Sequence, residues 1–444
     1  MCRRLMILLL LSVSMVKGQE LSFRQVDTTT YSQYLRGDWK GLIETGKQAL
    51  ENDINYYYLQ MRMAYACFSL EQYRKAAHYY KQALQFNRTD AIANEYLYYS
   101  YSYGGMYHDA QVQEEALTGQ QKTAMGINGE SNFRSFGILA GRSGSNAHNI
   151  VDDIADAMQP AEDGTQKATY GISFLQANLS HAAGSRLIVD HGLSLLRKNE
   201  LSYVVTGGSL YLSEEQPVNQ FEYQLNVEIT PMTGMVINPF IHYLNTSIPL
   251  YLETSYGRNT GADRIPVSNL KLRHWVPGIS IEQKASYFDI GASFVYHTIN
   301  TINTSQAGIH ASYYPFANLN LYFSLDAYLQ WLSYNDNRQR QLIFKPLAGF
   351  KVHRNLWMEI SATSPDHINF YDVRNNIAFN NLEMNRGSLE VNGIIPLYKS
   401  GNRLFIGYRY QALSSGYFPV NNLTEPIHQI EYNSHLITGG IQWK

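Results

Sequence analysis

From residue 168 to the C-terminus, apolar and polar side chains alternate along the chain. Phe221 and Tyr223, for example, alternate with Glu222 and Gln224. Successive side chains of a β-strand point to opposite faces of a sheet, so each such segment predicts a strand with one apolar and one polar face. We count about fourteen strands, within a range of about 12 to 16. The segments lie near residues 168–180, 185–196, 200–212, 219–231, 234–246, 269–283, 285–298, 304–314, 318–333, 339–352, 355–363, 386–398, 402–412 and 431–444.

The length of these segments favours a membrane barrel. Most contain about ten or more residues, enough to cross a bilayer at a ~45° tilt, whereas strands of soluble sheets average about five or six. Short separators such as 353–355 alternate with long ones at 247–268, 364–385 and 413–430, as in outer-membrane barrels. We therefore expect residues 168–444 to form an antiparallel transmembrane β-barrel. The alternative is an exported soluble β-sandwich, whose strands would also alternate.

Composition and hydropathy agree with a barrel. Aromatic residues make up 13 % of the chain and charged residues only 16 %. No run of about 18 apolar residues follows residue 18, which excludes spanning helices and leaves a closed barrel as the membrane solution. Alternation is blurred at 185–196 and 200–212. Pro277 lacks the N–H that a β-ladder needs and would have to lie at a bulge.

The last predicted strand is apolar on one face, with Ile437, Gly439, Ile441 and Trp443 in alternate positions. This ending resembles the C-terminal strand of Gram-negative outer-membrane barrels, which the insertion machinery reads. The resemblance implies that Ile437, Ile441 and Trp443 form the barrel insertion signal. Here Lys444 follows the aromatic residue, whereas that family typically ends on the aromatic residue itself.

Residues 23–118 carry an internal repeat. Trp39, Tyr73 and Tyr107 stand at intervals of 34 residues, and small or apolar residues downstream keep the same register. The middle unit has Met63, Ala64, Cys67, Tyr73, Ala76, Tyr80 and Ala83 at the helix-contact positions. The spacing predicts stacked helical hairpins, and about three units are the minimum for a stable solenoid.

These residues resemble the tetratricopeptide repeat, a helix-turn-helix module, with departures at Gln60 and Arg88. The resemblance implies a concave groove that binds a peptide or protein, and Tyr65, Phe68 and Tyr99 would face that groove. The alternative is that these three rings pack helix against helix, because aromatic residues at helical spacing are commonly part of a core.

The remaining segments are read as a signal and a connector. Residues 1–18 have the layout of a signal peptide, with Arg3 and Arg4 before an apolar stretch too short to span a membrane. Its removal would leave Cys67 as the single cysteine, so we expect no internal disulfide. Residues 119–167 are expected to be a connector or plug segment with a weak strand pattern at 131–142, and the acidic residues near 152–156 a solvated helix face rather than a metal site.

The sequence offers no recognisable catalytic motif, so we expect no catalytic residues, no metal site and no cofactor, and we expect that the protein is not an enzyme. Three ionisable residues on predicted polar strand faces could be cited for a hydrolase of the outer membrane, namely His297, Asp289 and Asp326. The simpler interpretation of these three residues is that they are solvated side chains of the lumen. With 35 basic and 37 acidic residues, the chain shows no basic patch for nucleic acid.

We expect an outer-membrane protein with a periplasmic helical arm, in contact with the lipid bilayer. The first functional hypothesis is that the tetratricopeptide-like arm docks a periplasmic or outer-membrane protein partner, as part of an assembly, secretion or envelope complex. The alternative is a pore or substrate-selective transporter, gated by the arm or by residues 143–167.

Overall fold

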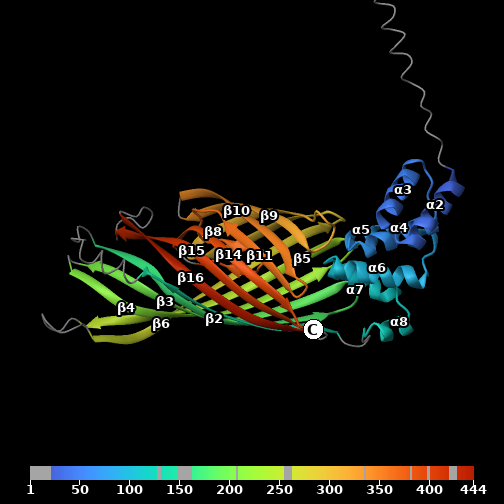
Figure 1. Ribbon diagram of the computed structural model, residues 1–444. Helices are drawn as coiled ribbons and strands as arrows, with labels where there is room; N and C mark the ends of the chain where they lie inside the picture. Colours follow the sequence, from blue (N-terminus) through green and yellow to red (C-terminus); the bar gives the residue numbers. More distant parts are fainter. Residues whose placement is uncertain are drawn as a thin grey trace, which may run out of the picture.

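The computed structural model describes residues 22–127, 132–147, 163–206, 209–254, 263–334, 337–380, 383–397, 401–419 and 428–444. It has an N-terminal helical domain followed by a closed antiparallel β-barrel of 14 strands (Figure 1). The expected signal peptide and acidic helix lie outside the described residues. None of the helices in the described part of the chain is long and apolar enough to cross a membrane.

The helical domain consists of antiparallel helices at one end of the barrel (Figure 1). They are α2 (Phe23–Arg36), α3 (Trp39–Glu51), α4 (Tyr57–Ser69), α5 (Tyr73–Phe86), α6 (Ala91–Tyr103), α7 (Tyr107–Gln113), the 3₁₀ turn η1 (Glu114–Ala116) and α8 (Gly119–Ala124). Helices α2, α4 and α6 begin 34 residues apart, and so do α3, α5 and α7. The repeat register of the sequence is therefore also the register of the helices.

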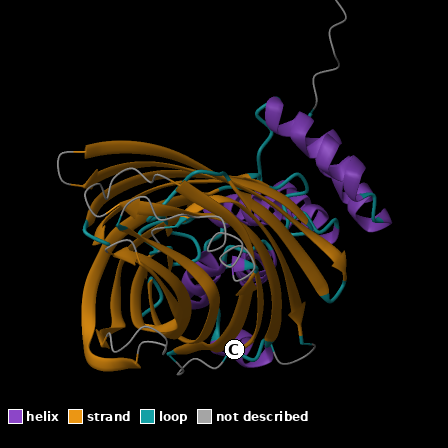
Figure 2. Ribbon diagram, turned by 90° about the vertical axis from the view of Figure 1, so that its left-hand side faces the viewer, coloured by secondary structure: helices purple, strands orange, loops and turns teal. Residues whose placement is uncertain are grey.

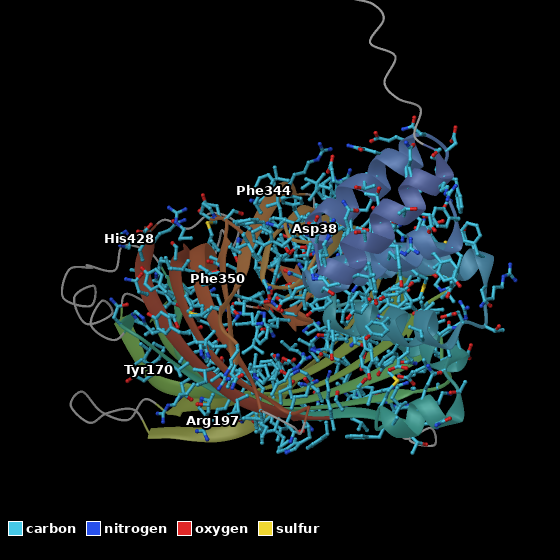
Figure 3. All side chains as sticks on the ribbon, turned by 45° about the vertical axis from the view of Figure 1, so that its right-hand side comes forward. Asp38, Tyr170, Arg197, Phe344, Phe350 and His428 are labelled. Carbon is cyan, nitrogen blue, oxygen red and sulfur yellow. The ribbon has the colours of Figure 1, made fainter. Side chains whose placement is uncertain are left out.

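Local chemistry explains where these helices start and stop. The Ser22 hydroxyl accepts from the Gln25 N–H to begin α2, and Gly37, at φ 70°, ends it in the left-handed conformation. Asp38 (Figure 3) caps α3 by accepting from the Gly41 N–H. Between the helices, small residues such as Ala76 and Ala64 are fully buried, which lets the helices approach closely.

The barrel is closed by pairing of the first and last strands, and every neighbouring pair is antiparallel. Its strands are β1 (Phe133–Ser145), β2 (Gly164–Ala182), β3 (Leu187–Thr206), β4 (Ser209–Ile229), β5 (Met235–Thr254), β6 (Asp263–Lys284), β7 (Phe288–Ile299), β8 (Ile302–Tyr313), β9 (Leu321–Tyr334), β10 (Asn337–His353), β11 (Leu356–Thr363), β14 (Met384–Pro396), β15 (Arg403–Pro419) and β16 (His428–Trp443). A separate two-stranded hairpin, β12 (Tyr371–Asp372) and β13 (Ile377–Ala378), lies between β11 and β14.

The barrel is apolar outside and polar inside, which distinguishes it from a soluble sandwich. On β9, Phe323 is 48 % exposed on the outer face, whereas Asp326 and Gln330 are buried on the inner face. Phe344 of β10 is likewise exposed outside (Figure 3), and its neighbour Lys345 is buried inside. An exposed apolar belt around a closed sheet needs lipid to cover it, so the chain has the fold of an outer-membrane β-barrel.

Two strand predictions were wrong, and their errors cancel in the strand count. The first strand of the barrel is β1, which overlaps the weak strand pattern at 131–142 that we assigned to the connector and not to the barrel. The segment 200–212 is not one strand, because it contains the end of β3 and the start of β4. A register shift between Glu200 and Ser202 interrupts the alternation there, which is the physical reason for its blurred pattern.

Two expectations about separators, and one about Pro277, also need correction. Residues 143–145 belong to β1 and residues 164–167 to β2. These two described parts of the 143–167 segment are therefore strands of the barrel wall and do not form a plug in the lumen. Separators 247–268 and 413–430 are largely strand, since β5 and β15 extend well into them. Pro277 lies in β6 opposite Ile241 without a bulge, next to the point where the ladder to β7 begins at Gly278.

Candidate functional site: a constriction inside the barrel

The long segment between β11 and β14 folds into the barrel. We name residues 364–380, which make up most of its described part, the constriction loop. Figure 2, which looks into the end of the barrel away from the helices, shows loop segments inside the ring of strands. The loop contains the β12–β13 hairpin and contacts β4 to β10 through side chains that point into the lumen.

Two aromatic residues anchor the loop in apolar pockets of the inner wall. Tyr371 stacks on Phe240 of β5 with ring centroids 5.5 Å apart, and is fully buried. Phe370 contacts Tyr328 of β9 edge to face and stacks on Phe379, which lies on the same loop. Because each buried ring removes a large apolar area from water, these contacts hold the loop at a fixed depth.

Polar wall residues hold the backbone of the loop. The Gln306 amide donates to the Tyr371 carbonyl at 2.7 Å, and its oxygen accepts from the Tyr371 N–H at 3.2 Å. The Gln330 amide donates to the Asn369 carbonyl at 3.1 Å. Lys345 forms an ion pair with Asp372, and their side chains are 8 % and 2 % exposed. A buried pair of this kind strongly favours one position, since separation would leave two uncompensated charges.

The loop divides the lumen into two cavities that meet beside it. The inner cavity has a volume of about 490 Å³ and the outer cavity about 1420 Å³. The inner cavity reaches Glu228 and Glu282, near the helical end, and the outer cavity reaches Arg338, near the opposite end. Seven residues line both cavities, namely Gln176, Asn178, Gln224, Arg374, Asn375, Asn376 and Gln442. We call this set the junction.

The helical domain covers the end of the barrel that carries the short turns. Arg74 of α5 is buried and makes a bidentate ion pair with Asp289 of β7, with N–O distances of 2.7 and 2.9 Å. Its guanidinium also lies 3.6 Å from the centre of the Tyr314 ring. Burial alone would lower the pKa of Arg74, but the hydrogen bonds and charge of Asp289 more than offset this and keep that pKa above its ordinary value.

Further contacts extend this interface across the mouth of the barrel. Asp109 of α7 accepts a hydrogen bond from the Gly234 N–H, in the turn between β4 and β5, at 2.7 Å. Burial raises the pKa of Asp109, although this hydrogen bond opposes the shift. The Gln111 amide donates to the Gly184 carbonyl, in the turn between β2 and β3, at 2.8 Å. The domain is therefore fixed to several turns of the rim.

The residues predicted to face a groove meet in one aromatic cluster. Tyr65 contacts the rings of Tyr34, Trp39 and Tyr96, and Phe68 contacts those of Tyr73, Tyr96 and Tyr103. Tyr99 stacks on Tyr103 with centroids 5.9 Å apart. All three are half-buried, so they pack between helices and keep part of each ring accessible. A partner-binding role for this face stays a prediction.

The predicted insertion signal lies at the seam of the barrel. Ile437 is 65 % exposed on the outer face of β16. Ile441 pairs with Ile138 of β1, and Trp443 stacks on Phe136 of the same strand at 5.7 Å. The role of these residues in insertion stays a prediction.

The residues considered for a hydrolase are separated in space. Asp289 is bound to Arg74, and His297 is buried on β7. Asp326 accepts from His310 Nδ1 at 2.7 Å, and His310 Nε2 lies 2.9 Å from the Ser312 hydroxyl. Asp326, His310 and Ser312 thus form a chain of hydrogen bonds like that of a catalytic triad. Ser312, however, is buried against Ser324 and lines neither cavity, so its hydroxyl is not accessible as a nucleophile.

Among the described residues, no group of three or more His, Cys, Asp or Glu side chains is placed to hold a metal ion. The constriction loop and its anchors were not predicted from the sequence. The available signal was the run of aromatic and asparagine residues in 364–385, together with the inward positions of Gln306, Gln330 and Lys345 on polar strand faces.

No protein-family model and no curated protein matches the chain. Among solved structures, a FadL homologue of Pseudomonas aeruginosa is similar at 6 % identity and a TM-score of 0.43, covering 70 % of this chain and 90 % of that one. The toluene transporter TodX of Pseudomonas putida is similar at 8 % identity and a TM-score of 0.42, covering 73 % and 93 %.

Proposed function

We propose that this protein is a substrate-selective pore of the outer membrane. The observation that carries the proposal is the constriction loop, which is anchored inside the lumen between two cavities that share lining residues. A loop fixed by a buried ion pair and two aromatic anchors narrows a passage without filling it. This is the arrangement expected of a pore that selects its solutes at one point.

The orientation is also part of the proposal. The short turns of an outer-membrane barrel face the periplasm. The helices lie at that end, so the helical domain would be periplasmic and would cover the inner mouth of the pore (Figure 1). The domain would then control passage between the lumen and the periplasm, in addition to the selection made at the constriction.

Single-channel recording in planar bilayers tests the pore. We expect small, steady currents from the wild type and larger, noisier currents from Lys345→Met, because the loss of Lys345 leaves Asp372 buried without its partner and loosens the loop. Lys271→Met is the matched control, since Lys271 is exposed and lines neither cavity. The absence of current from both the wild type and Lys345→Met would refute the proposal.

A second candidate function is the docking of a protein partner by the tetratricopeptide-like arm. One observation favours it. The hydrogen bonds and ion pairs that fix the domain to the barrel come from residues 71–114, whereas α2 and α3 project away from the barrel (Figure 1). Tyr31 and Tyr58, on α2 and α4, are exposed. Crosslinking in native membranes should capture a partner with the wild type and lose it with Tyr31→Ser/Tyr58→Ser.

A further inference from the structure

The junction between the two cavities has an unusual composition. Six of its seven residues are the uncharged amides of asparagine and glutamine, and the seventh is Arg374. Arg374 lies on the constriction loop between β12 and β13, where its backbone N–H donates to Asp372 Oδ1 at 3.2 Å. A solute that passes from one cavity to the other therefore meets one charge, surrounded by groups that can both donate and accept hydrogen bonds.

The guanidinium of Arg374 is only loosely paired. Its Nη1 lies 3.9 Å from Asp326 Oδ2 and 3.5 Å from His310 Nδ1, while the other oxygen of Asp326 is bound by His310 at 2.7 Å. The Arg374 side chain is 43 % exposed to the cavities, in contrast to the tightly buried Lys345 and Asp372. Its N–H donors are therefore placed to bind an anionic group of a solute, and a guanidinium binds carboxylates with good geometry.

Beyond the junction the charge changes sign. The inner cavity is lined by four carboxylates, those of Asp190, Glu228, Glu282 and Asp326. Three of them have a basic neighbour, because Glu228 lies against His108, Glu282 against Lys284 and Asp326 against His310. Arg374 and this acidic wall together present a positive group followed by negative groups along the path. A solute with a net negative charge is opposed by the inner cavity, and one with a net positive charge is opposed by Arg374. A solute carrying both charges is favoured at both points.

We propose that the junction is a binding and selectivity site for small zwitterionic solutes, such as amino acids and short peptides, with their carboxylate on Arg374 and their ammonium group toward the inner cavity. This inference rests on the proposed pore function and names its substrate class. The inner cavity, at about 490 Å³, falls within the size range of small-molecule sites. Arg374 is then the residue that determines specificity, and the six amides bind the uncharged parts of the solute.

Block of the ion current by added solutes tests the site in the full-length protein. Glycylglycine is the zwitterionic probe, and glutarate and cadaverine are probes of similar length with two like charges. We expect glycylglycine to block the wild type most strongly. Arg374→Gln should weaken this block about tenfold or more, because it removes a charge-assisted hydrogen bond. It should also raise the permeability ratio of potassium over chloride.

Two variants control the experiment. Arg374→Lys should retain part of the block, since it keeps the charge but loses the planar fork of donors. Arg354→Gln should change nothing, because Arg354 is exposed on the turn between β10 and β11 and lines neither cavity. Faster migration of unboiled than boiled protein on a gel verifies that each variant has a closed barrel.

Three outcomes would overturn the inference. Equal block of the wild type and Arg374→Gln by glycylglycine, with ion current retained, refutes the site and leaves the pore intact. Glutarate block as strong as that of glycylglycine means that the junction selects anions, which refutes the zwitterionic class. The absence of ion current from the wild type and from Lys345→Met refutes the pore, and the site with it.

Discussion

The helical domain and the barrel bury opposite kinds of side chain. In the helical domain, Leu42, Met63 and Ala76 are fully buried, as in a soluble protein. In the barrel, Gln306 and Gln330 are fully buried, and large apolar residues such as Ile309 are exposed. Burial therefore has two meanings in one chain. In the helices it marks a core that excludes water, and in the barrel it marks the lumen, where the proposed pore lies.

The largest expected effect separates the two regions. Ala76→Glu places a charged side chain at a fully buried position, so we expect it to unfold the helical domain at a cost of more than about 3 kcal/mol. Cys67 reports on this change, because burial raises the pKa of its thiol to about 12 and keeps it unreactive at neutral pH. Thiol labelling should be fast in the variant and slow in the wild type.

The matched control is Ala116→Glu, at a position of the helical domain that is exposed and should tolerate the charge. In both variants we expect unboiled protein to keep its faster gel migration, because the barrel has its own closed network of hydrogen bonds. Loss of this migration in Ala76→Glu would mean that the two regions do not fold separately.

The second prediction concerns closure of the barrel. Deletion of Trp443 and Lys444 removes the ring that stacks on Phe136 across the seam, so we expect a severalfold lower abundance in the outer membrane and greater proteolysis. Gln442→Ala, on the inner face, should preserve abundance. Membrane fractionation with immunoblotting measures the abundance of the two variants in the outer membrane. Normal abundance of the truncated protein would argue against an insertion signal in β16.

The third prediction tests how firmly the two regions are joined. Arg74→Met leaves Asp289 buried without its charge partner, which typically costs about 3–5 kcal/mol. We expect faster hydrogen exchange in α5 to α7 and an unchanged barrel. Arg62→Met is the control, since Arg62 pairs with Asp27 inside the helical domain. Equal exchange in Arg74→Met and the wild type would show that Arg74 does not hold the domain in place.

The smallest expected effect is a pH dependence of docking. Because the pKa of Asp109 is raised in the docked state, that state binds the proton more tightly than the undocked one. Docking through Asp109 should therefore strengthen as the pH falls through the raised pKa and weaken at higher pH. His108, beside Asp109, pairs with Glu228. The measurement is therefore the difference between the wild type and Asp109→Asn in the pH dependence of hydrogen exchange in α7. If hydrogen exchange in α7 depends on pH equally in the wild type and in Asp109→Asn, Asp109 is not the group that makes docking depend on pH.

The two regions also differed in what could be predicted from the sequence. The helical register and most strands followed from local periodicity, as Tyr73 and the alternation around Phe323 illustrate. The contacts that make the site did not, because their partners are far apart along the chain. Arg74 and Asp289 are 215 positions apart, and Gln306 and the Tyr371 carbonyl are 65 apart. Periodicity places a residue on a face but does not identify the loop that will meet it.

The seam of the barrel sets the order in which the molecule can assemble. β1 pairs with β16, the last strand of the barrel in sequence order, so the ring closes only when all the strands between them are present. The contacts within the helical domain are local and form quickly, whereas long-range strand pairing is slow. We therefore expect a finished helical domain to precede the ring. Its rim contacts at Gly184 and Gly234 would then act as a template on which the hairpins are gathered before the final strand joins the first.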